Sequence, residues 1–331
     1  MGWNEMRAAG ALVLGCLIGL PAAQAQTGSR VFATGEKPAL EDVYPDRVTR
    51  FPGGVTGLAD VVYSVIPGYR PLILDLYLPA KAKRRGPRPL VMYIHGGGWT
   101  GGHTRQAGAT ADFPKVLASL AAEGFVVASL EYRLSGEAQF PAQLQDVRAA
   151  IRFLKGGADR YGIDSARVGI WGGSAGGHLA ALAALSCGAP GFDAKPQPAG
   201  SECVQAAVTW YGVFDFKPIL LQVRGGPNAL LGCDKAADCP ADKVAAVSPL
   251  TWLDRSDPPF LLIHGTEDKV VPIAQSEAAY AAMQAAGVPV ERIFIPGVDH
   301  SFIGRTPAET RAATLQALNA TFDFFHRRLD R

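Results

Sequence analysis

The chain has 331 residues, of which 48% are hydrophobic and 19% are charged, and its formal net charge is +2. This length is sufficient for one large domain with a single core. The even mix of charges excludes a strongly basic nucleic-acid-binding chain and a strongly acidic one. We therefore predict no nucleic-acid partner, and no motif indicates a cofactor.

The N-terminal segment has the features of an export signal. An apolar run over residues 8–20 follows a basic residue, and residues 23–25 read Ala-Gln-Ala, the pattern that a signal peptidase accepts. The run is shorter than the about 20 residues of a membrane-spanning helix. We predict a signal peptide over residues 1–25 and a secreted or periplasmic protein without a membrane span. The alternative is a lipoprotein anchored at Cys16, because residues 13–16 loosely resemble a lipoprotein cleavage box.

Four cysteines follow the predicted leader, and an even number in an exported chain indicates disulfides. Proximity in sequence favours pairing Cys187 with Cys203 and Cys233 with Cys239. Unpaired buried thiols are the alternative. The cysteines form no CxxC pair and have no histidine at ligand spacing, so we predict no metal site.

Strand-like and helix-like segments alternate after a Pro- and Gly-rich lead-in. Continuous apolar or alternating runs indicate strands, and apolar residues at helical spacing indicate helices. The predicted order is strand 72–78, strand 89–94, helix 112–122, strand 125–131, helix 142–154, strand 168–171, helix 175–185, strand 206–211, strand 260–264, helix 273–286, strand 290–295 and helix 307–327. Such alternation predicts an α/β fold with a mostly parallel central sheet flanked by helices on both faces. Residues 26–331 are expected to form a single domain, with a cap-like insertion at about 213–257.

Residues 172–176 read Gly-Gly-Ser-Ala-Gly between a predicted strand and a predicted helix. This is the G-x-S-x-G pattern in the context that a nucleophile elbow requires. The turn is so tight that flanking side chains would clash, and it places the Ser174 hydroxyl at a helix N-terminus, where N–H groups favour a developing anion. A serine that only caps the helix is the structural alternative. The surrounding elements favour Ser174 as a nucleophile.

A second glycine-rich motif, residues 95–99, reads His-Gly-Gly-Gly-Trp at the end of a predicted strand. Acyl transfer requires backbone N–H donors aimed at the negative oxygen of the tetrahedral intermediate, and glycines allow the backbone to approach it closely. We predict that the N–H groups of Gly97, Gly98 and Ala175 form this oxyanion hole. His95 is interpreted as an orienting residue of the loop.

These two motifs resemble those of the α/β-hydrolase superfamily, in its branch of HGGG-bearing esterases. Residues 131–134, 176–180 and 257–265 resemble a narrower group, the bacterial feruloyl-esterase-like and carbohydrate-esterase-like hydrolases, which share features with hormone-sensitive-lipase-like enzymes. The similarity extends from about residue 61 to the C-terminus. It implies an α/β-hydrolase fold and a serine carboxylesterase that forms an acyl-enzyme.

The superfamily order is serine, acid, histidine. Relatives carry the acid before a Val-Val-Pro or Val-Ile-Pro segment, which corresponds to Asp268 here, with Glu267 as the neighbouring alternative. His300 follows the last predicted strand and is the expected general base, which takes the hydroxyl proton and returns it to the leaving alcohol. His178 and His264 are interpreted as structural.

The substrate is less defined by the sequence. Trp99, Trp210 and Tyr211 end predicted strands near the site and are candidates for lining an acyl or sugar pocket, with core packing as the alternative. Export is compatible with small carboxylic esters and with acetyl or feruloyl esters of plant polysaccharide. A secreted peptidase or amidase of related fold is a further alternative, and so is a non-catalytic hydrolase-fold binding protein. The oligomeric state is not predicted.

Overall fold

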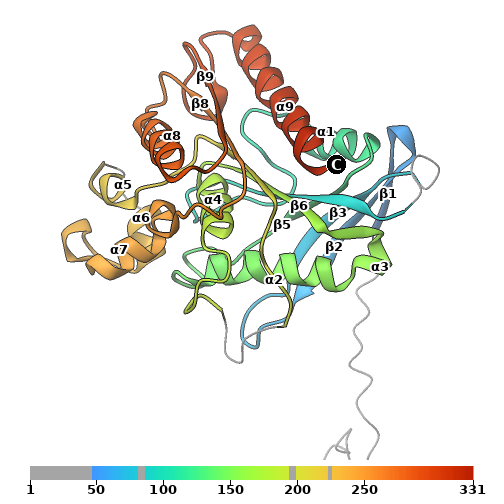
Figure 1. Ribbon diagram of the computed structural model, residues 1–331, viewed down its shortest axis with the longest axis horizontal. Coiled ribbons are helices and arrows are strands. Elements are labelled where there is room, and N and C mark those ends of the chain that lie inside the picture. Colours follow the sequence, from blue (N-terminus) through green and yellow to red (C-terminus); the bar gives the residue numbers. More distant parts are fainter. Residues whose placement is uncertain (1–46, 81–85, 194–198, 223–225, 331) are drawn as a thin grey trace, which may run out of the picture. The chain divides into compact units, whose positions relative to one another are not determined.

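The computed structural model describes residues 47–80, 86–193, 199–222 and 226–330. The predicted signal peptide and Cys16 lie outside these residues. Within them, one nine-stranded sheet has the order β1-β2-β3-β5-β4-β6-β7-β8-β9 (Figure 1). The strands are β1 (Arg47–Phe51), β2 (Val55–Ser64), β3 (Leu72–Leu78), β4 (Arg88–Ile94), β5 (Val126–Leu130), β6 (Ile163–Gly173), β7 (Ala206–Trp210), β8 (Phe260–Gly265) and β9 (Val290–Ile295).

Strands β4 to β9 pair in parallel, as predicted, whereas β1, β2 and β3 pair antiparallel with their neighbours. The strands β1 and β2 were not predicted, because the lead-in lacks a clear alternation. In β1 four of the five residues are exposed, so no apolar period marks it. Residues 47–64 therefore include two strands that the sequence did not indicate.

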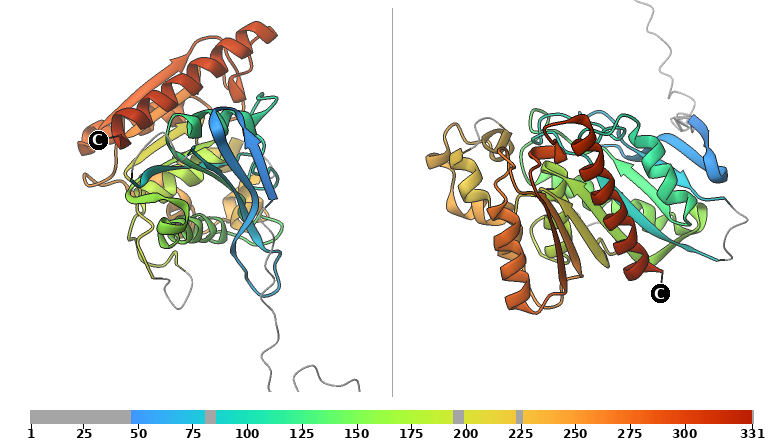
Figure 2. Two further views of the ribbon diagram at one scale, coloured as in Figure 1. Left: turned by 90° about the vertical axis from the view of Figure 1, so that its right-hand side faces the viewer. Right: turned by 90° about the horizontal axis from the view of Figure 1, so that it is seen from above.

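Helices cover both faces of the sheet (Figures 1 and 2). Leu90 and Met92 of β4 face a core that includes residues of α2, α4 and α8, whereas Val91 and Tyr93 face a second core with α1 and α9. Successive strand residues point to opposite faces, so a strand covered on both sides is apolar throughout. The helices are α1 (Phe113–Ala122), α2 (Ala142–Gly156), α3 (Ala158–Tyr161), α4 (Ala175–Leu185), α8 (Ala274–Ala286) and α9 (Pro307–Leu329).

The segment between β7 and β8, predicted as an insertion, is helical. It contains α5 (Phe216–Gln222), α6 (Gly226–Leu231) and α7 (Ala241–Val247), and it lies beside α8 in Figures 1 and 2. Gln275 of α8 accepts hydrogen bonds from the backbone N–H groups of Phe214 and Asp215, each at 2.8 Å. Among the described residues no helix is long and apolar enough to cross a membrane.

Both predicted cysteine pairings are present. Cys187 is bonded to Cys203 and Cys233 to Cys239, with Cα atoms 5.0 Å and 5.4 Å apart. The first bond closes the loop that follows α4. The second closes a short loop between α6 and α7.

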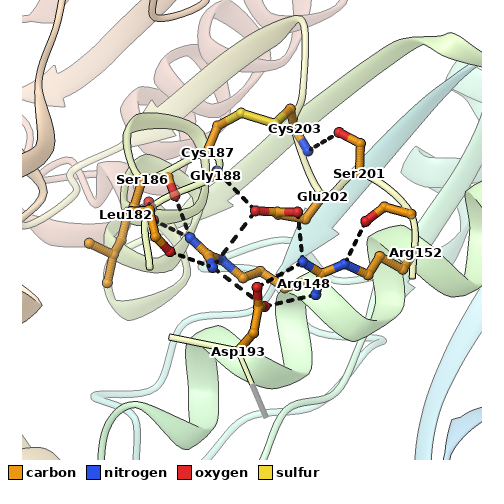
Figure 3. Close-up of polar contacts among 12 residues, drawn as sticks. Arg148, Arg152, Leu182, Ser186, Cys187, Gly188, Asp193, Ser201, Glu202 and Cys203 are labelled. Carbon is orange, nitrogen blue, oxygen red and sulfur yellow. Dashed lines mark hydrogen bonds and ion pairs between the residues drawn. A yellow bond between two sulfur atoms is a disulfide. The ribbon is translucent and has the colours of Figure 1, made fainter. Parts of the chain in front are cut away.

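An ion cluster lies beside the first disulfide (Figure 3). Arg152 of α2 pairs with Asp193 at 2.8 Å and with Glu202 at 2.7 Å. Arg148, one helical turn earlier, is fully buried and approaches the same two carboxylates at 3.4 Å and 3.7 Å. Buried cations require partners of this kind, so the cluster ties α2 to Asp193 and Glu202 of the loop that the disulfide closes.

Candidate active site

Ser174 lies in a tight turn between β6 and α4, with φ 56° and ψ −121°. Its backbone N–H donates to the carbonyl oxygen of Trp210 at 2.9 Å. A Cβ atom at Gly172 would collide with the carbonyl of Gly176, and one at Gly176 would collide with the carbonyl of Ile94. Only glycines therefore fit the two positions that flank the turn, and the strained serine is the feature expected of a nucleophile elbow.

The structure brings Ser174, His300 and Asp268 into one chain of hydrogen bonds. His300 Nε2 lies 3.0 Å from Ser174 Oγ, and His300 Nδ1 lies 2.8 Å from Asp268 Oδ2. An ionised carboxylate only accepts hydrogen bonds, so Nδ1 carries the ring proton and Nε2 is free to accept the serine proton. Glu267 is exposed, whereas the Asp268 side chain is fully buried. The aspartate rather than its neighbour therefore faces the imidazole.

Two backbone N–H groups and two histidines surround the Asp268 carboxylate. Its Oδ1 accepts from the N–H groups of Val270 and Val271 at 2.9 Å and 2.8 Å, and its Oδ2 faces His300 and His264. Burial raises the pKa of Asp268, but the hydrogen bonds from His264 and His300 outweigh it and hold the pKa well below its ordinary value. The group is therefore a carboxylate at neutral pH.

His300 is oriented by Asp299, for which the sequence analysis predicted no role, and by the ring of Tyr211. Its backbone N–H donates to Asp299 Oδ1 at 2.7 Å, and the same oxygen accepts from the N–H of Lys269 at 2.9 Å. The ring packs against Tyr211, with centroids 4.6 Å apart. Asp299 joins the loop of the acid to the loop of the base, a role that only the folded arrangement makes visible.

The His95–Trp99 loop borders the same cavity as Ser174. Gly97 and Gly98 have φ values of 118° and 60°, and the N–H groups of Thr100 and Gly101 both donate to the Gly97 carbonyl at 3.1 Å. Positive φ values of this kind favour glycine. Ala175 begins α4 directly after the serine, so its N–H is one of the free donors at that helix N-terminus.

His95 supports this loop from within the core. Its Nδ1–H donates to the Gly96 carbonyl at 2.7 Å, and its ring stacks on Tyr132 at 4.4 Å. Burial lowers the pKa of His95 to about 4, so the imidazole is neutral at pH 7. This agrees with an orienting residue.

A cavity of about 470 Å³ opens above Ser174. Glycines of the oxyanion loop and of the elbow form much of its wall, and Gln106, Tyr211 and Val270 provide larger side chains. Tyr211, a candidate pocket residue, lies in this wall. The neighbouring Arg105 is tied to the buried Asp75 at 2.8 Å, which anchors the loop that carries Gln106.

Trp99 and Trp210 do not line this cavity, which corrects the sequence-based expectation. Their exposed fractions are 3% and 2%, and each belongs to a core cluster. Trp99 Nε1 donates to His178 Nδ1 at 3.2 Å, and Trp210 Nε1 donates to Thr321 of α9 at 3.0 Å. Both indoles therefore have their polar atom satisfied inside the protein, as buried tryptophans require.

The described part of the chain contains no group of three or more His, Cys, Asp or Glu residues arranged to hold a metal ion.

The BD-FAE family model matches residues 74–283, which is more than half of the chain. Esterase LipQ of Mycobacterium tuberculosis is 32% identical over 74% of this chain and 57% of its own length. The chain spans about half the length of the curated relatives that it matches.

Two solved structures extend the comparison to the fold. A truncated carbohydrate esterase from gut microbiota is 28% identical and has a TM-score of 0.69, covering 83% of this chain and 96% of that one. Esterase 2 of Thermogutta terrifontis, phosphorylated by paraoxon, is 25% identical and has a TM-score of 0.66, covering 81% of this chain and 93% of that one. The family model matches more than half of the chain, and the parallel sheet carries Ser174 at the turn after β6. The chain therefore belongs to the BD-FAE family of α/β-hydrolase esterases.

Proposed function

We propose that the protein is a serine carboxylesterase with Ser174 as nucleophile, His300 as general base and Asp268 as the acid that orients it. The observation that carries this proposal is the hydrogen-bonded chain from Ser174 Oγ through His300 to Asp268, which opens onto the glycine-walled cavity. Membership of an esterase family supports the same reaction class.

The reaction proceeds in two halves. Ser174 Oγ attacks the ester carbonyl carbon while His300 Nε2 takes the hydroxyl proton, and the carbonyl oxygen becomes an oxyanion. The N–H groups of Gly97, Gly98 and Ala175 hold this oxyanion, and each such donor contributes about 3 kcal/mol to transition-state stabilisation. His300 then gives the proton to the leaving alcohol. Water, deprotonated by His300, then attacks the acyl carbon. The bond from this carbon to Ser174 Oγ breaks, His300 returns the proton to Oγ, and the carboxylic acid leaves.

The ester is proposed to be an acyl decoration, acetyl or feruloyl, on a carbohydrate, with a small free ester as the alternative. The likeness to a carbohydrate esterase supports a sugar-linked substrate. The cavity of about 470 Å³ is large enough for either acyl group. The choice between them is an experimental question.

Hydrolysis of p-nitrophenyl acetate, p-nitrophenyl octanoate, methyl ferulate and acetylated xylan, with Ser174→Ala as the matched control, tests the proposal. We expect ester hydrolysis that is abolished in Ser174→Ala, with unchanged circular dichroism, and covalent labelling of Ser174 by a fluorophosphonate. Hydrolysis of a peptide anilide in preference to every ester would support the peptidase alternative. No turnover and no labelling would support a non-catalytic binding protein.

We further propose that the protein is secreted or periplasmic, with residues 1–25 as a cleaved leader. Two disulfides are compatible with an oxidising compartment. The N-terminus and intact mass of the protein recovered from a bacterial host test this. A mature chain that begins at residue 26 is expected, whereas a diacylated chain that begins at Cys16 would show the lipoprotein alternative.

A further inference from the structure

His264 is a buried histidine next to the proposed triad. It lies in β8, four residues before Asp268, and its side chain has no exposed surface. Its Nδ1 is 2.7 Å from Ser276 Oγ on α8, and its Nε2 is 2.8 Å from the Val271 carbonyl oxygen. The same Nε2 is 3.3 Å from Asp268 Oδ2.

These partners determine which ring nitrogen carries the proton. A carbonyl oxygen only accepts hydrogen bonds, so His264 Nε2 must be protonated to satisfy its contact with Val271. Nδ1 of the neutral ring is then an acceptor, and the Ser276 hydroxyl donates to it. The Nε2–H therefore donates to the Val271 carbonyl at 2.8 Å, and Asp268 Oδ2 lies 3.3 Å from the same nitrogen.

We infer that His264 is a positioning residue of the esterase, which donates through Nε2–H to the Asp268 oxygen that orients His300. This inference rests on the proposed function. His264 and His300 approach the same Oδ2, whereas Oδ1 is occupied by backbone N–H groups. Without His264, the oxygen that faces the general base has one donor instead of two, and its negative charge is less compensated.

Other charged or titratable groups near the Asp268 carboxylate could also affect the pH profile of the enzyme. The ring of Tyr211 packs on His300, and Lys269 pairs with Asp299 at 3.1 Å nearer the surface. Among the described residues, Tyr211, Lys269 and Asp299 make no hydrogen bond or ion pair with His264. A change at His264 therefore reaches His300 through Asp268.

The consequence has a definite sign. Removing the Nε2–H donor leaves more negative charge on Asp268 Oδ2, and this charge stabilises protonated His300. The acid limb of kcat/KM, which reports protonation of the base in the free enzyme, then moves to higher pH. We expect a displacement of about half to one pH unit, the effect of one hydrogen bond to a charged neighbour.

The experiment compares His264→Leu, which has no donor, with His264→Gln, whose amide N–H can occupy the Nε2 position. The matched control is Ser276→Ala, which removes the partner of Nδ1 and leaves Nε2–H in place. In His264→Leu the acid limb of kcat/KM is expected to lie at higher pH than in the wild type, with a several-fold lower kcat. In His264→Gln the acid limb is expected to return to its wild-type position. Ser276→Ala is expected to lose stability while keeping the wild-type limb. An active His264→Leu variant with an unchanged acid limb of kcat/KM would overturn this inference but not the proposed esterase function.

A measurement on the wild-type chain keeps the test independent of whether His264→Leu folds. In histidine side-chain ¹⁵N NMR spectra, His264 should be the Nε2–H tautomer, and its resonance should move in Asp268→Asn. A His264 protonated only at Nδ1 would overturn the inference. A wild-type protein that neither hydrolyses esters nor reacts with a fluorophosphonate would instead overturn the proposed function on which it rests.

Discussion

Trp99 Nε1 donates a hydrogen bond to His178 Nδ1 at 3.2 Å, which joins the oxyanion loop to the helix that follows the nucleophile. His178 Nε2–H in turn donates to the Val247 carbonyl of α7 at 2.7 Å. Three segments that are far apart in the sequence therefore meet at one neutral imidazole. A protonated His178 could not accept from the indole, so this junction depends on pH.

The first prediction is a loss of stability in acid. Burial lowers the pKa of His178, and likewise that of His95, to about 4, below the about 6.5 of an unfolded histidine. The unfolded state then binds more protons between these values, so stability falls as pH decreases from about 6.5 to 4, by up to about 1.4 kcal/mol per unit for each histidine. Urea unfolding at pH 7, 5.5 and 4.5 measures this. In His178→Gln the slope should be smaller by up to about 1.4 kcal/mol per pH unit, and an equal slope would contradict the assignment.

A second prediction concerns the corrected tryptophans. Trp99→Phe leaves His178 Nδ1 without a donor, and Trp210→Phe does the same to Thr321, so each should destabilise the fold by about 1 to 3 kcal/mol. Because neither indole lines the cavity, KM for p-nitrophenyl acetate should stay within about twofold of wild type. KM of Tyr211→Phe, a change in a residue that does line the cavity, is measured for comparison. A large KM increase in Trp210→Phe alone would show that the indole contacts substrate.

The tryptophans also show what the sequence could and could not predict. The elbow at Ser174 follows from a local motif, whereas Asp268 and His300 were assigned from the family resemblance and the chain order that it implies. The structure adds the distances that join the three side chains. Trp210 ends a strand near Ser174, but the face on which its side chain lies depends on the packing of α9, which no local pattern encodes. His264 was interpreted as structural, and its contact with Asp268 depends on the turn that follows β8.

The fold shows the same limit. Buried parallel strands such as β4 have continuous apolar runs, and most of them were predicted to within a residue or two. The strand β6 begins at Ile163, five residues before the predicted start, because residues 164–167 are not buried. The exposed β1 has no such run, because it is held by backbone pairing to β2 rather than by apolar burial. The segment between β7 and β8 is tied to α8 by Gln275, which accepts from Phe214 and Asp215, and α7 is tied to α4 by the bond from His178 to Val247. The sequence of this segment has little periodicity of its own.

A third prediction compares the two disulfides. Cys187 and Cys203 are 16 residues apart, and Cys233 and Cys239 are 6 apart. In the chain-entropy model the longer loop contributes about 3 kcal/mol and the shorter about 2 kcal/mol. Double serine variants of each pair, unfolded in urea, test the order. An equal or smaller loss for Cys187→Ser/Cys203→Ser would indicate that the ion cluster of Arg148 and Arg152 holds this loop without the covalent bond.

A fourth prediction concerns stability at the C-terminus. His326 of α9 contacts Glu123 at 2.7 Å and Asp330 at 2.5 Å. Burial lowers the pKa of His326, but the two carboxylates outweigh it and raise the pKa above its ordinary value. The stabilisation is therefore complete below the unfolded pKa and is lost as pH rises through the folded one. Its size is at most about 1 kcal/mol for a partly exposed group. His326→Gln should remove this pH dependence, and a variant that retains it would contradict the assignment.

The last prediction compares a glycine of the nucleophile elbow, Gly176, with a glycine outside it, Gly101. A Cβ at Gly176 would meet the rigid backbone carbonyl of Ile94, whereas one at Gly101, which also lines the cavity, meets nothing within 4 Å. Gly176→Ala must displace β4 or α4 and should abolish turnover, with a loss of several kcal/mol in stability, because overpacking against backbone has no side chain to relax. Gly101→Ala should fold with wild-type stability and narrow the cavity, raising KM for p-nitrophenyl octanoate more than for the acetate. Wild-type activity in Gly176→Ala would show that the turn does not need the close approach of α4 to β4.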